Sequence, residues 1–313
     1  MTMDSFEIVS SKRDAAEPIA SSLETLACLE TKAYLSLSER EKLRRSIEGT
    51  VASMTAESLA GRFHVGLEQD RLYEQPLARF RELILAPATR LATLRQFIET
   101  ELPAGKPDFF KVLFIETVAR QLGREWVDDS CDFLDVTIGT ARLQELVLAL
   151  AQDYHHAKHT KGTPLAVVMM PYGEQHTLMP TLLGLLFDTL GWSRQVLAPD
   201  TRFGPAFVEA VTHADVACIG WSNSRLVGEF CLLIDRIRSL RTKKRLPLIV
   251  GGAAALEAVD FLVDMGIDCI CDSVYSAARI CQNFYELEKL TSQAQRSRRT
   301  AVLKTNGLDW LSS

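Results

Sequence analysis

Long apolar runs are missing from this sequence. No stretch reaches the roughly 20 apolar residues that a membrane-spanning helix needs, and the longest candidate, around Leu182–Leu190, is interrupted by Asp188. The first residues also lack the basic start and apolar core of a secretory signal. We therefore expect a cytoplasmic protein that makes no membrane contact.

An excess of positive charge is missing too. The chain has 35 lysines and arginines against 40 aspartates and glutamates, a formal net charge of −5, which argues against a broad nucleic-acid-binding surface. No helix-turn-helix pattern stands out. One local basic run consists of Arg236, Arg238, Arg241, Lys243, Lys244 and Arg245. It lies at the end of a predicted helix, whose dipole favours cations there, so we expect at most weak or indirect DNA contact.

Cysteines at metal-binding spacing are also absent. The 7 cysteines are scattered, and Cys269 and Cys271 have no second pair nearby, so no zinc site is predicted. Cys218, Cys231, Cys269 and Cys281 lie among apolar neighbours, which is typical of core thiols in a reducing compartment. The 313 residues are 47% hydrophobic and 24% charged, values of a globular protein of about two domains.

The first part of the chain is predicted to be an extension. Residues 1–75 mix serine, glutamate and alanine with weak periodicity at the start, so we expect partial disorder over Met1–Leu35. A helix is predicted over Ser36–Arg62, because Ser38 precedes Glu41 at capping-box spacing. Residues 1–75 are therefore predicted to be a region separate from the rest of the chain.

Residues 76–160 are predicted to form a four-helix bundle. Apolar residues repeat at helical spacing, and Pro103–Pro107 breaks the pattern. Phe110–Leu122 and Thr137–Ala151 are the two later amphipathic segments, and four such helices with short breaks are typical of a bundle. The polar segment Tyr154–Thr163 marks the boundary.

Within that boundary segment, His155 and His159 have the i, i+4 spacing of a metal pair on a helix. No third ligand lies nearby. A solvated linker is therefore the favoured interpretation.

Residues 161–290 change to strand–helix alternation. Short apolar runs without polar alternation indicate strands that are buried on both faces. The predicted strands are Leu165–Met170, Gln195–Leu197, Val216–Trp221, Leu246–Val250 and Ile267–Cys271, and the predicted helices are Thr177–Leu190, Phe203–His213, Leu226–Leu240, Ala254–Met265 and Ser276–Leu290. This pattern predicts a Rossmann-like, doubly wound sheet of five parallel strands. Residues 291–313 are predicted to be a flexible basic tail.

Three loops after predicted strands carry a spaced motif. Glu174-x-His176-x-x-Met179 is followed by 42 residues, then Ser222-x-Ser224, then 26 residues, then Gly251-Gly252. Ligands in such sheets bind at the carboxyl ends of the strands. The register resembles the D-x-H-x-x-G, S-x-L and G-G motifs of cobalamin-binding domains, with Glu for Asp, Met for Gly and Ser for Leu.

The resemblance implies roles for these residues. His176 would be the axial ligand to cobalt, and Glu174 would hydrogen-bond its far ring nitrogen. Thr177 and Met179 would lie beside the corrin ring, with Met179 where the family has glycine. Small residues would keep open a slot for the displaced nucleotide tail, and these are Ser222, Ser224, Gly251 and Gly252.

The helical part resembles the cap of the same proteins. Trp126, with Phe133, Val136 and Thr137 after it, matches the upper-face segment of cobalamin photoreceptors, in which a histidine stands at the Thr137 position. The variant segment, with the G-E-Q-H-T sequence, most resembles AerR/PpaA-type antirepressors of photosynthesis genes. This resemblance covers roughly Phe110–Leu290. It implies a tetrapyrrole-binding regulator that contacts a PpsR/CrtJ-type repressor and holds adenosylcobalamin or hydroxocobalamin.

Three other interpretations remain open. The chain can be a haem sensor, because neutral imidazole suits iron and cobalt alike. It can be a corrinoid methyl carrier of a methyltransferase system, although Glu174 and Met179 depart from the motif expected there. It can also be an interaction module that has lost its ligand. The favoured prediction is a regulator, responsive to light or redox state, without enzymatic activity.

Overall fold

A computed structural model describes Leu67 and residues 71–103, 105–154, 162–242 and 244–306. Its description of side chains excludes Arg71 and residues 291–306. Nearly all of the predicted extension, and both His155 and His159, lie outside the described residues.

The first described part is the helical cap, in which four helices enclose an aromatic core. They are α3 (Arg71–Leu85), α4 (Leu91–Thr100), α5 (Phe109–Val127) and α6 (Phe133–Tyr154). Phe80 is fully buried and packs on Phe97 and Phe114, with ring centroids 5.1 and 5.5 Å away. Arg142 of α6 donates to the carbonyls that end α3, at Ile84 and Ala86. The four predicted helices are confirmed, although α3 begins five residues before position 76.

The second part is a five-stranded, entirely parallel sheet. The strands are β1 (Leu165–Met169), β2 (Ser193–Val196), β3 (Val216–Gly220), β4 (Leu248–Gly251) and β5 (Cys269–Cys271). Their order is β2-β1-β3-β4-β5. Each predicted strand overlaps an observed one. The apolar runs are continuous because helices cover both faces, so the side chains of the inner strands are buried on either side.

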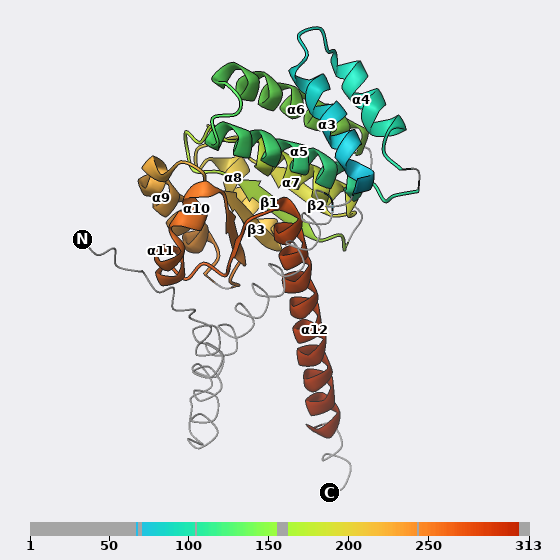
Figure 1. Cartoon of the computed structure of the whole chain (residues 1–313). Coiled ribbons are helices and arrows are strands. Elements are labelled where there is room, and N and C mark those ends of the chain that lie inside the picture. The colour runs from blue at the N-terminus through green and yellow to red at the C-terminus, as the bar shows by residue number, and fades with distance from the viewer. Residues whose placement is uncertain (1–66, 68–70, 104, 155–161, 243, 307–313) are drawn as a thin grey trace, which may run out of the picture. The chain divides into compact units, whose positions relative to one another are not determined.

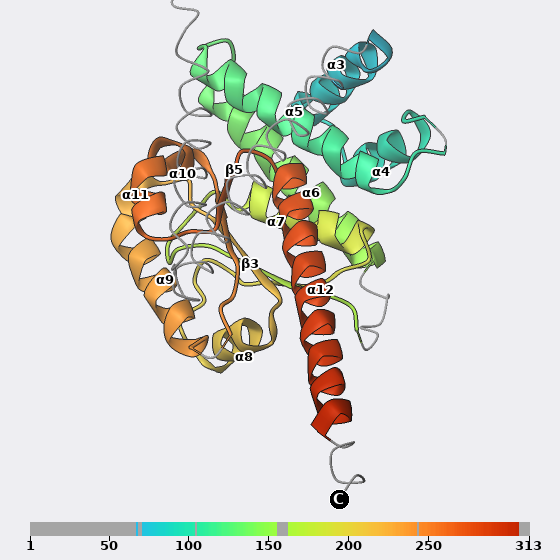
Figure 2. The same ribbon diagram turned by 90° about the horizontal axis from the view of Figure 1, so that it is seen from below.

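Different sets of helices cover the two faces of the sheet (Figures 1 and 2). One face packs on α7 (Leu178–Thr189), α12 (Val274–Asn306) and the cap in a single core. The opposite face packs on α8 (Pro205–His213), α9 (Val227–Leu240), α10 (Ala253–Glu257) and α11 (Val259–Asp264). Alternation along β1 sends Val168 to the first face and Val167 to the second. The cap therefore lies on the α7–α12 side of the sheet.

Two helices differ from their predictions. The single helix predicted over Ala254–Met265 is two, because Ala258 leaves helical geometry at φ −114° and ψ 36°. Residues 291–306, predicted to belong to a flexible tail, are the last part of α12, which ends at Asn306. That segment contains no glycine or proline and is rich in residues of high helix propensity. No helix in the described part of the chain is long and apolar enough to cross a membrane.

Candidate functional site

The candidate site lies where the strand order reverses. From β1 the chain crosses to β2 on one side, while β3 lies on the other, so the loops after β1 and β3 diverge. This point is the usual ligand crevice of open parallel sheets. The β1–α7 loop carries Glu174 and His176, and Ser222 and Asn223 come after β3. The η1 turn (Ser224–Leu226) comes next.

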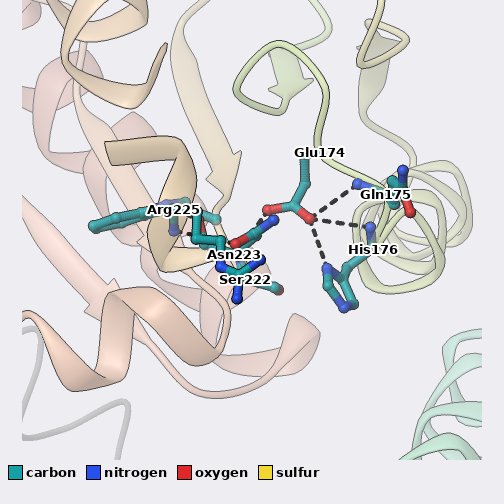
Figure 3. A network of polar contacts seen from close by, with 7 residues as sticks. Glu174, Gln175, His176, Ser222, Asn223 and Arg225 are labelled. Carbon is teal, nitrogen blue, oxygen red and sulfur yellow. Dashed lines mark hydrogen bonds and ion pairs between the residues drawn. The ribbon is translucent and has the colours of Figure 1, made fainter. Parts of the chain in front are cut away.

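Glu174 joins the two loops (Figure 3). Its Oε1 accepts from His176 Nδ1 at 2.6 Å and from the backbone N–H groups of Gln175 and His176 at 3.0 and 3.2 Å. Its Oε2 accepts from the backbone N–H groups of Ser222 and Asn223 at 2.9 and 3.0 Å. The predicted Glu174–His176 hydrogen bond is confirmed. The extra methylene of glutamate lets one carboxylate reach both loops.

This network fixes the charge of Glu174 and the orientation of His176. Burial disfavours the carboxylate, but hydrogen bonds from the His176 ring and from the Ser222, Asn223 and His176 amides outweigh it, so the pKa of Glu174 is lowered. A carboxylate can only accept at Nδ1, so the neutral imidazole carries its proton there. Nε2 then keeps a free lone pair on a side chain that is 65% exposed. Such an imidazole can bind a metal through Nε2.

Thr177 and Met179 begin α7 beside this loop. Thr177 holds the N-cap position, and its carbonyl accepts from the Thr181 hydroxyl at 2.8 Å. Met179 lines a cavity between α7 and the sheet. Its unbranched thioether side chain is adaptable, so a methionine at this position does not fix the shape of the cavity mouth.

This cavity opens between the sheet, α7, α12 and α5. It contains about 630 Å³ of empty space, part of it open to solvent. Ser222, Gly251 and Gly252 line it, as predicted for a slot, and Met179, which was predicted to lie beside the corrin ring, lines it too. Ser224 does not line it and is exposed at the start of η1. The prediction for Ser224 is wrong, because the chain turns away from the sheet directly after Asn223.

Gly251 and Gly252 would respond differently to an added side chain. A Cβ on Gly251 would lie 3.0 Å from both the carbonyl oxygen and the Sγ of Cys271, at the cavity wall. A Cβ on Gly252 would lie 2.4 Å from the carbonyl oxygen of Trp221, and its φ is +115°. Gly252 is therefore required by the backbone itself. Of the two, Gly251 is the one suited to a substitution that tests the width of the cavity.

The cap contacts the start of α7, which directly follows the β1–α7 loop. Gln144 of α6 donates to the Thr181 hydroxyl at 2.9 Å. Thr181 lies in the first turn of α7, four residues after the N-cap Thr177, so this hydrogen bond holds the middle of α6 against the start of α7.

Helical spacing then orients the start of α6. Phe133, Thr137 and Gln144 share one face of the helix, because they are separated by four and seven residues. Gln144 faces α7, so Phe133 and Thr137 face the same side about two to three turns earlier. Trp126 contacts Phe133 edge-on at 6.2 Å between centroids, and the two are 45% and 71% exposed. Val136 is half-buried beside them.

No protein-family model matches the chain. A Rhodobacter capsulatus protein, named an uncharacterized 20.5 kDa protein in bchF-crtJ intergenic region, is 30% identical over 163 residues. That match covers 51% of this chain and 84% of the relative. The chain belongs to the family of that protein.

Two solved structures were found to be similar, and the first of them supports the fold. The Methanosarcina barkeri monomethylamine corrinoid protein matches with a TM-score of 0.50 and 14% identity, over 68% of this chain and 99% of that one. A cobalamin-binding protein from Desulfitobacterium hafniense matches with a TM-score of 0.38 and 13% identity, over 67% of this chain and 97% of that one. The first match shows that this chain, with its helices followed by a five-stranded Rossmann-like domain, has the fold of that corrinoid protein.

Some cavity residues were not predicted from the sequence. Glu116 and Arg120 of α5 line the cavity, and so do Cys218 and Cys271. Cys218 lies 3.4 Å from Cys281, sulfur to sulfur, and both are free thiols. Apolar neighbours in the sequence mark Cys218 and Cys281 as core residues. For Glu116 the sequence carries no signal, because its burial depends on how α5 packs against the start of α12.

Several side chains of the basic run between Arg236 and Arg245 form hydrogen bonds or ion pairs within the protein. Arg238 donates to the carbonyls of Met265 and Gly266, and Arg241 to those of Thr212 and Ala214. Arg245 pairs with Asp268 at 2.8 Å. Lys243 lies outside the described residues. These contacts tie the run to the ends of α8 and α11, and DNA contact stays an untested prediction.

Proposed function

We propose that this chain is a cobalamin-binding regulator in which His176 is the axial ligand to cobalt. The observation that carries the proposal is the position of His176. Its ring is oriented by a buried carboxylate that also binds the backbone of Ser222, and Ser222 lines the cavity. A cobalamin whose nucleotide base has left the metal needs both features.

The donor set fits a metal that arrives inside a macrocycle. Among the described residues, no group of three or more His, Cys, Asp and Glu side chains could hold a bare metal ion. One imidazole with a free Nε2 is enough for a metal whose other ligands come from a tetrapyrrole. Bound adenosylcobalamin would supply a cobalt–carbon bond that light can break.

The chain's own residues have distinct tasks in this proposal. Glu174 holds the His176 tautomer and raises the basicity of Nε2. Gly251 keeps the cavity open for the nucleotide tail. Trp126 at the end of α5 and Phe133 at the start of α6 both expose apolar surface and would contact the upper face of the ring. Thr137 supplies no second metal ligand, so the upper face stays available to a removable group.

The regulatory part of the proposal rests on the family. The gene of the Rhodobacter relative lies in the bchF-crtJ intergenic region, and crtJ shares its name with the CrtJ-type repressors. We propose an AerR/PpaA-type antirepressor that acts in the cytoplasm through a PpsR/CrtJ-type repressor. Light or redox state would be the signal, and the chain would catalyse no reaction.

Visible absorption spectra test ligand binding. The purified chain is titrated with hydroxocobalamin, adenosylcobalamin and haemin, alongside His176→Ala and a control, His213→Ala, in which an exposed histidine outside the site is removed. We expect cobalamin binding by the wild type and the control, and its loss in His176→Ala. Binding of haemin alone would contradict cobalamin and favour the haem sensor. Equal cobalamin affinity in all three proteins would contradict the role of His176.

A further inference from the structure

One wall of the cavity comes from the helical cap. Glu116 and Arg120 project from α5 into a cavity whose other walls are the sheet, α7 and α12. Glu116 is fully buried, whereas the Arg120 side chain is 31% exposed. A charged pair at the edge of an otherwise mostly apolar cavity is costly unless each charge has partners.

The two side chains are fixed against the β5–α12 corner. Glu116 Oε1 accepts from the Val274 N–H at 2.9 Å and lies 3.9 Å from Arg120 Nη1. Arg120 Nη1 donates to the Asp272 carbonyl at 2.6 Å. The carboxylate of Asp272 is engaged by the Ser276 hydroxyl at 3.2 Å. The guanidinium is thus held at the rim of the cavity by a buried carboxylate and a backbone carbonyl.

Arg120 keeps hydrogen-bonding capacity for a ligand. A guanidinium has five N–H donors, and the described part of the chain uses only Nη1 of Arg120. The remaining donors form the planar fork that suits a phosphate oxygen pair. Among the described residues that line the cavity, Arg120 is the one cationic side chain, so it is the group there that can pair with an anion.

We propose that Arg120, positioned by Glu116, determines specificity for corrinoids that carry a nucleotide tail, by binding the phosphodiester of that tail. The inference rests on the proposed function, because it takes the cavity as the tail slot. Haem and tail-free corrinoids have no phosphodiester to bind there. Because Arg120 belongs to the cap, a bound tail also adds a contact between the cap and the sheet.

Affinities for two corrinoids test this assignment. Hydroxocobalamin and diaquocobinamide both offer an exchangeable axial position, but only the first has the nucleotide tail. In Arg120→Met, we expect hydroxocobalamin affinity to fall about ten-fold or more, as for loss of a charge-assisted hydrogen bond. Diaquocobinamide affinity should stay within about two-fold of wild type, since the axial site is intact. Lys111→Met removes a cation from the same helix outside the cavity and should change neither affinity.

The outcomes separate this inference from the proposed function. An equal fall for both corrinoids, or no fall for either, would overturn the role of Arg120 while His176-dependent binding persists. A wild-type chain that binds neither corrinoid would overturn both proposals. Arg120→Lys keeps the charge without the fork and should lose less affinity for hydroxocobalamin than Arg120→Met. If Arg120→Met does not fold, Arg120→Lys is compared with wild type instead. A loss of hydroxocobalamin affinity without a loss of diaquocobinamide affinity then supports the role of Arg120, and no selective loss overturns it.

Discussion

Replacing Glu174 by glutamine should destabilise the fold and the metal site together. The carboxylate accepts five hydrogen bonds, two at Oε2 from the β3 loop and three at Oε1 from its own loop and the His176 ring. A glutamine amide has one oxygen, and its NH₂ group can only donate. In either orientation, two backbone N–H groups therefore lose their acceptor.

The size of the effect depends on that count. Each buried donor left without a partner costs about 1–3 kcal/mol, so the loss of two acceptors in Glu174→Gln should lower the free energy of unfolding by about 2–6 kcal/mol. His176→Ala removes only one of the five bonds and should cost about 1 kcal/mol. Urea unfolding followed by circular dichroism measures both. Glu257→Gln, the same change at an exposed carboxylate, is the control and should leave the free energy of unfolding unchanged.

Metal binding gives a second measure of the same substitution. If the glutamine NH₂ faces His176, the ring must accept at Nδ1, and its proton moves to Nε2, the atom that would bind cobalt. If the oxygen faces His176, the charged acceptor is still lost. Hydroxocobalamin affinity should fall about 10–100-fold, as for other losses of a metal ligand's orienting partner. A Glu174→Gln protein with wild-type unfolding free energy and wild-type affinity would refute the bridging role.

Three further predictions concern pH, the cavity and the cap. Because the pKa of Glu174 is lowered in the folded protein, its carboxylate stabilises the fold above its ordinary pKa near 4.5, and this stabilisation is lost as the pH falls through the folded pKa. In urea unfolding between about pH 3 and 7, the unfolding free energies of wild type and Glu174→Gln should therefore converge only at the acid end. Gly251→Ala should weaken hydroxocobalamin binding more than diaquocobinamide binding, because its Cβ lies 3.0 Å from Cys271 atoms at the cavity wall, while Gly228→Ala, with no atom within 4 Å, should change neither. Trp126→Ala should reduce the difference between dark and illuminated adenosylcobalamin protein in affinity for a PpsR/CrtJ-type repressor; an unchanged difference, measured by calorimetry, would remove Trp126 from the coupling.

Periodicity is a sound guide to this fold because burial here follows the backbone repeat. Val167 and Val168 pack on opposite faces of the sheet, and such two-sided burial appears in sequence as an unbroken apolar run. The spacing of His176, Ser222 and Gly251 locates the edge of the sheet, because each residue lies at or just after the end of a strand. The motif spacing placed Ser224 at the slot together with Ser222, but a short turn begins at Ser224 and that residue does not line the cavity.

Other parts of the site depend on contacts that no local pattern encodes. The burial of Glu116 is decided by Val274, 158 residues later in the chain. The reach of Glu174 to Ser222 and Asn223 depends on the pairing of β1 with β3. The sequence pattern predicts its bond to His176, which is two residues away, but it cannot predict a bond across 48 residues.

Electron paramagnetic resonance of the cobalt(II) cobalamin complex tests the central assignment most directly. The chain is labelled uniformly with ¹⁵N and loaded with unlabelled cobalamin, so the axial nitrogen reports its origin. If His176 binds cobalt, each superhyperfine triplet of the unlabelled complex becomes a doublet in the labelled one, and the doublet is lost in His176→Ala. A triplet that persists in the labelled wild-type protein would show that the nucleotide base still holds the metal, and would contradict the account.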